Sequence, residues 1–201
     1  MEIQRALSQI SEIHGRLAKT DVYRGYRAVP VALSGGLALL AAAVQGKLVG
    51  NGSPESFVYY WVGAALLCSA TAGGGIVYSY VGQESQLARR RTRTVVGQLL
   101  PCVAAGVGVT ALMVRLGTES IAFLPGLWAI LFSLGVFASR PYLPKNIGWV
   151  ALFYMVAGTV LLAMAGDSSS LSPWGMGLTF GVGQMLAGVV LYWDLERKSV
   201  R

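Results

Sequence analysis

The chain has 201 residues, of which 54% are hydrophobic and 12% are charged, whereas an average soluble domain carries about 25% charged residues. This composition excludes a conventional soluble globular protein, and the hydrophobic content also excludes a disordered chain. Two cysteines are too few for a disulfide framework. The mean hydropathy of +0.57 indicates a chain that lies mostly in lipid.

Residues 1–27 carry eight charges and no continuous apolar core, which excludes a secretory signal peptide. Their apolar side chains recur at spacings of three and four, which places them on one face of an amphipathic helix with a basic opposite face. These apolar residues are Ile3, Leu7, Ile10, Ile13 and Leu17. Such a helix could lie along the anionic inner leaflet, dock on the protein's own cytoplasmic end, or bind a partner helix.

Six windows without a charged side chain follow, each long enough to cross a hydrocarbon layer of about 30 Å as a helix. They cover residues 28–46, 57–82, 95–114, 121–139, 147–165 and 174–193. The connections are too short to fold separately, and residues 194–201 form a short tail. We therefore expect one all-α membrane domain of six transmembrane helices over residues 28–193, preceded by the amphipathic segment.

The orientation follows from the lysines and arginines in the connections, because these residues stay on the cytoplasmic side. Fourteen lie before the first window, in the second and fourth connections and in the tail, and only Lys47 and Arg115 lie on the opposite side. We therefore expect both termini to lie in the cytoplasm. The simplest host membrane is a bacterial inner membrane.

The windows contain none of the groups that membrane catalysis and ion transport need. All 25 charged residues lie outside them, which disfavours an intramembrane proton relay. The one histidine is His14, so histidine ligation of haem or metal within the bilayer is excluded. An acid or base would have to come from the interfaces, from Asp21, Glu84 or Asp194. We expect no enzyme, no cofactor and no metal.

Clustered arginines flank the first and third windows. Arg24 and Arg27 precede the first window, and Arg89, Arg90, Arg91 and Arg93 lie in the second connection. Guanidinium groups suit phosphate, so these residues are candidate contacts for anionic lipids or another anion at the cytoplasmic face. Positive-inside placement already explains the basic balance, and we expect no nucleic-acid partner.

Glycines mark two windows, and small residues let membrane helices approach closely. Gly73, Gly74 and Gly75 are candidates for a packing face in the second window, and Gly177, Gly181 and Gly188 share one face of the sixth. Gln184 lies on that same face near mid-membrane, and Gln98 occupies a similar short motif in the third window. These two amides are the candidate polar intramembrane site.

Two classes of function fit these features. The first is a non-catalytic membrane protein that acts by interaction, as a subunit of a homo-oligomer or larger membrane complex, or as a sensor or regulatory partner. The alternative is a passive channel or binding protein for a small uncharged or amphipathic solute, lined by groups that include Gln184, Thr110, Thr159 and Thr179.

Overall fold

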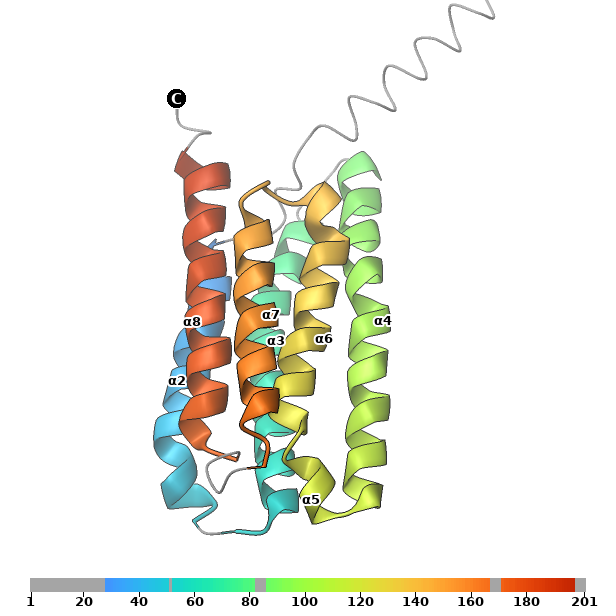
Figure 1. The fold of residues 1–201 in the computed structure, drawn as a ribbon. Helices are drawn as coiled ribbons and strands as arrows, with labels where there is room; N and C mark the ends of the chain where they lie inside the picture. Colours follow the sequence, from blue (N-terminus) through green and yellow to red (C-terminus); the bar gives the residue numbers. More distant parts are fainter. Residues whose placement is uncertain (1–27, 51, 82–85, 167–170, 198–201) are drawn as a thin grey trace, which may run out of the picture.

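The computed structural model describes residues 28–50, 52–81, 86–166 and 171–197, and all regular structure within these ranges is helical. Six long helices lie side by side and alternate in direction (Figure 1). They are α2 (Ala28–Leu48), α3 (Pro54–Val81), α4 (Gln86–Leu116), α6 (Leu124–Ser139), α7 (Ile147–Ala163) and α8 (Pro173–Leu191). Short pieces complete the fold: α5 (Thr118–Ile121), the 3-10 turn η1 (Arg140–Tyr142) and the π-helical turn η2 (Tyr192–Glu196).

The expected all-α fold is confirmed. Five helices, α2, α3, α4, α6 and α8, are long and apolar enough to cross a membrane, while α7 is a shorter apolar helix of 17 residues. At 1.5 Å per residue α7 is about 26 Å long. The predicted N-terminal amphipathic helix, together with Arg24 and Arg27, lies outside the described residues.

Helix α4 is longer than the third charge-free window, because it begins at Gln86, nine residues before Val95. Arg89, Arg90, Arg91 and Arg93 therefore lie in the first turns of a helix and not in a connection. Leucine, arginine, glutamine and alanine all have high helix propensity, so the change from charged to apolar residues marks the expected edge of the lipid without ending the helix.

Other boundaries shift by a few residues for local reasons. Helix α3 begins at Pro54, since proline suits the first helical position and the Ser53 hydroxyl accepts a hydrogen bond from the Ser56 amide at 3.4 Å. Gly117, with φ of 111°, ends α4 in a conformation that favours glycine. The window expected from Ile121 begins at the last residue of α5, and its helix α6 begins at Leu124.

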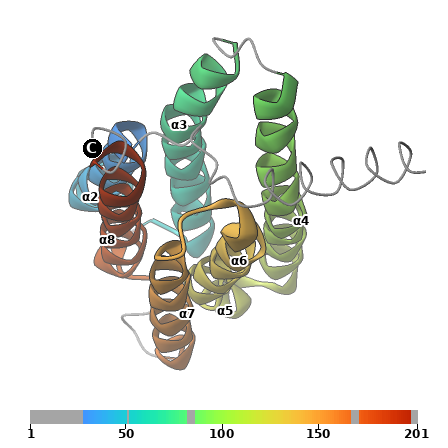
Figure 2. The same ribbon diagram turned by 90° about the horizontal axis from the view of Figure 1, so that it is seen from above.

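Viewed along the bundle, α2 lies beside α8, followed by α7 and α6, and α4 lies on the far side of α6 (Figure 2). The centre contains Tyr154 of α7, which is fully buried. Its ring centroid lies 4.8 Å from that of Phe132 and 5.6 Å from that of Phe180. Edge-on aromatic contacts of this kind stabilise the meeting of α6, α7 and α8.

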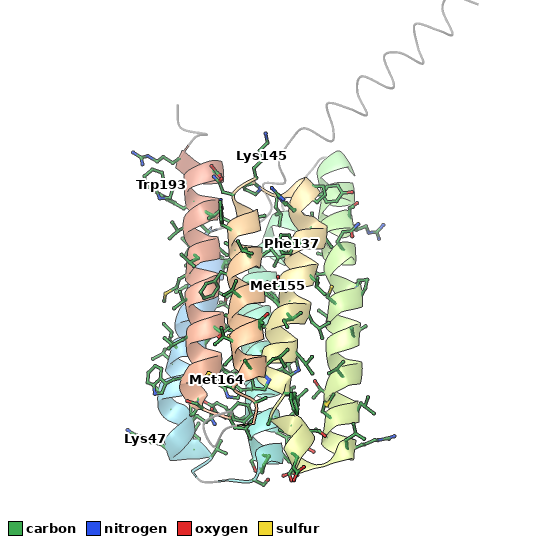
Figure 3. All side chains as sticks on the ribbon, viewed as in Figure 1. Lys47, Phe137, Lys145, Met155, Met164 and Trp193 are labelled. Atoms are coloured by element: carbon green, nitrogen blue, oxygen red, sulfur yellow. The ribbon has the colours of Figure 1, made fainter. Side chains whose placement is uncertain are left out.

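The two ends of the bundle differ in charge. Lys145 and Trp193 lie at one end and Lys47 at the other (Figure 3). The end with Lys145 also receives the first turns of α4 and the last turn of α8 (Figure 1). We call it the basic end, defined by Arg93, Arg140, Lys145 and Arg197, and the opposite one the Lys47 end.

Candidate functional site

Glycines of α8 allow its close contact with α2. A Cβ atom added at Gly181 would lie 2.6 Å from Cγ of Leu39, and one at Gly188 would lie 2.9 Å from Cβ of Ala32. Gly177 meets Ala42 in the same way. Because lipid gives no hydrophobic drive for helix association, this close packing is what holds two apolar helices together.

The glycine cluster of α3 has different surroundings. A Cβ atom added at Gly73 or Gly74 would meet nothing within 4 Å, so neither residue packs against another helix in the described part of this chain. Gly75 lies in α3, but its surroundings fall outside what the structure describes. Gly73 and Gly74 therefore form no packing contact comparable to the one between α8 and α2.

The two candidate amides lie on different helices and at different places. Gln184 of α8 is half-buried, and its Cβ lies 3.1 Å from the Cβ position of Gly35 on α2. Gln98 is half-buried on α4, which packs mainly against α6. Among the described residues neither amide has a side-chain hydrogen bond. The structure therefore does not bring them together into one site.

Interhelical hydrogen bonds occur instead at residues that the sequence did not single out. Trp61 of α3 donates its indole N–H to Oε1 of Gln45 on α2 at 2.7 Å, and both side chains are buried. Ser133 of α6 donates to the carbonyl oxygen of Ala151 on α7 at 2.7 Å. Buried polar groups in lipid need such partners, so these contacts fix the pairing of neighbouring helices.

Two of the threonines that were expected to line a solute pathway are not available for it, because their hydroxyl groups already form hydrogen bonds. The Thr110 hydroxyl accepts a hydrogen bond from the Trp128 indole at 2.8 Å and donates to the Gly106 carbonyl oxygen at 2.7 Å. Thr159 is exposed and donates to the Met155 carbonyl oxygen of its own helix. Only Thr179, at 6% exposure, and Gln184 are left as internal polar groups from the expected lining.

At the basic end, the structure describes the side chains of only some candidate anion contacts. Arg93 is exposed on α4, whereas for Arg89, Arg90 and Arg91 the structure gives the helical backbone alone. Asn146 donates a hydrogen bond to Asp194 at 2.9 Å, which joins the start of α7 to the end of α8. These interfacial groups are the principal charged features next to the apolar bundle.

The described residues contain no group of three or more histidine, cysteine, aspartate or glutamate side chains that could hold a metal ion. Of the three interfacial acids, Asp21 and Glu84 lie outside the described residues. Asp194 borders an open hollow of about 390 Å³ lined also by Asn146, Val189, Val190 and Trp193.

Among the candidate membrane spans, the apolar window of α4 has the smallest buried share. No residue of its 18-residue apolar window is buried, whereas 44% of the corresponding window is buried in α6 and in α8. Helix α4 therefore has faces along its membrane length that the rest of this chain leaves uncovered. Comparisons of the chain with protein-family models, with curated proteins and with solved structures found no match.

Proposed function

We propose that this chain is a non-catalytic integral membrane protein that acts by interaction, as a subunit of a membrane assembly or as a regulatory partner within one. In this proposal α2, α3, α4, α6, α7 and α8 each cross the membrane, most simply a bacterial inner membrane. The basic end, and with it both termini, faces the cytoplasm. The distribution of lysine and arginine between the two ends supports this orientation.

The observation that carries the proposal is the lack of burial along α4. A helix on the edge of a bundle normally buries one face, yet α4 buries none of its apolar window. A Cβ atom added at Gly108 would have no neighbour within 4 Å in the part of the chain that the structure describes. Small residues of this kind allow a helix of another chain to approach closely, so we assign α4 to the contact with a partner subunit.

The experiment is a mass measurement in mild detergent by size-exclusion chromatography with light scattering. We expect wild-type protein in a species larger than its own 21.3 kDa, and we expect Gly108→Leu to reduce that species without lowering the melting temperature. Gly36→Leu is the matched control, because Gly36 on α2 also has open space around it. A wild-type chain that is monomeric in detergent and uncrosslinked in native membranes would contradict the proposal.

The second candidate is a passive pathway for a small uncharged solute. It is favoured by one observation: the Thr179 hydroxyl is buried and, within the described residues, has no hydrogen-bond partner. A buried polar group without a partner is costly, and a solute or water with its own polar groups would relieve that cost. The substitution Gln184→Leu, on the same helix, separates this candidate from the subunit role.

A further inference from the structure

Helices α3 and α4 are neighbours in sequence, but they lie apart over much of their length (Figure 2). Each is held by a different partner. Helix α3 packs on α2, where Tyr60 donates a hydrogen bond to the Ala41 carbonyl oxygen at 2.6 Å. Helix α4 packs on α6, where an added Cβ at Gly135 would lie 2.9 Å from Leu99. The two helices therefore pack mainly on different neighbours.

Both helices carry large apolar side chains that no other part of the described chain covers. On α3, Leu66 and Val77 are 67% and 61% exposed, and on α4, Leu100 and Val103 are each 59% exposed. Gly73 has open space around it. We call these residues, with Val96 of α4, the α3/α4 face.

Positive charge lies directly at the basic end of this face. Arg93 is exposed, and Val96 and Leu100 follow it at spacings of three and seven, so all three lie on one side of α4. Arg89 occupies the same side one turn earlier by register. From Arg93 to Val103 the helix rises about 15 Å, which is half of the hydrocarbon thickness of about 30 Å. The face thus has positive charge at one end, followed by an apolar stretch about as long as one leaflet is thick.

We infer that the α3/α4 face binds an anionic phospholipid of the cytoplasmic leaflet. Its phosphate contacts Arg93 and the preceding arginine turn, and its acyl chains cover Val96, Leu100 and Val103 together with the exposed apolar side chains of α3. Charge complementarity selects this occupant, because a second copy would bring like charges together, whereas a phosphate suits guanidinium groups. The inference rests on the cytoplasmic placement of the basic end, but it needs no partner subunit.

The test is native mass spectrometry of the full chain extracted from mixed vesicles of phosphatidylcholine and phosphatidylglycerol in equal amounts. We expect wild-type protein to retain phosphatidylglycerol preferentially. In the variant with Arg89→Gln and Arg93→Gln we expect affinity to fall about fivefold for each arginine, since each basic residue near the surface adds roughly that factor. Arg140→Gln is the matched control, because Arg140 is exposed at the same end but lies beside Gly148 of α7.

A third variant tests the apolar part of the site without changing charge. Gly73→Trp fills open space beside the face, and we expect it to reduce lipid retention while the melting temperature stays unchanged. Equal retention by wild type and the double arginine variant would overturn the inference, as would an equal loss in Arg140→Gln. Protein adducts in place of lipid at a photo-crosslinker on Val103 would also overturn it. Loss of lipid retention with an intact assembly separates this site from the proposed subunit function.

Discussion

Gly181 shows how a single residue controls helix pairing in a bundle of this kind. Its carbonyl oxygen would lie 2.7 Å from a Cβ at Gly35, and its own added Cβ would lie 2.6 Å from Leu39. Both helices therefore present backbone to each other at this point. Glycine is required here for close approach, because any side chain would have to displace the other helix.

We expect Gly181→Leu to destabilise the protein, because the added bulk has no space between α8 and α2. Overpacking of a well-packed contact costs about 1 to 3 kcal/mol, which should appear as a lower melting temperature in detergent. Gly36→Leu, one residue from Gly35 on α2 but in open surroundings, should leave the melting temperature unchanged. A Gly181→Leu protein with wild-type stability would show that α8 and α2 do not pack as described.

At the residue scale the sequence predicted spacing but not partners. Gly177, Gly181 and Gly188 lie on one face by their spacing alone, and the structure gives α2 as their neighbour. Gln45 and Trp61 form a buried hydrogen bond, yet nothing within either helix indicates it, since it depends on which helices lie together. Gly73 and Gly74 look similar to the α8 glycines in sequence but have open surroundings, because spacing does not show which face a neighbour covers.

At the scale of elements the sequence predicted where the long helices lie, but a window without charge does not show where a helix begins. Absence of charge located all six long helices, because lipid excludes charged side chains. Helix ends have other determinants, including Pro54 at the start of α3 and the arginine turns of α4, which continue the helix beyond the lipid. Helices α3 and α4 lie apart because α3 packs on α2 and α4 packs on α6. No local feature of the sequence indicates these contacts.

The number of crossings is the prediction that belongs to this scale, because α7 has only 17 residues. Its length of about 26 Å is at the short end of the range that spans a bilayer. We expect it to cross, so reporter fusions after Lys145 and after Ser169 should report opposite sides, cytoplasmic and external respectively. A fusion after Asn51 should also be external. If the Lys145 and Ser169 fusions report the same side, α7 does not cross and the six-helix topology is wrong.

At the scale of the whole molecule, α4 is the candidate membrane span that the rest of the chain buries least. Helices α2, α6, α7 and α8 meet around buried glycines and the Tyr154 ring cluster, and α3 is joined to α2 by hydrogen bonds. Helix α4 contributes little to this core and presents membrane-length apolar surface instead. A core that packs through small residues, next to a helix with exposed apolar residues, favours a protein that acts through its surface.

Gln184 distinguishes surface interaction from an internal pathway. The substitution Gln184→Leu removes the amide at nearly constant volume. Interhelical hydrogen bonds in membranes contribute only about 0.6 kcal/mol on average, and this amide has none among the described residues. We therefore expect Gln184→Leu to keep its melting temperature and its assembly size.

We also expect vesicles that contain the wild-type or the variant protein to take up glycerol no faster than protein-free vesicles, measured by stopped-flow light scattering. Faster glycerol entry with wild-type protein that disappears in Gln184→Leu would assign the amide to a solute pathway and replace the subunit role with the second candidate.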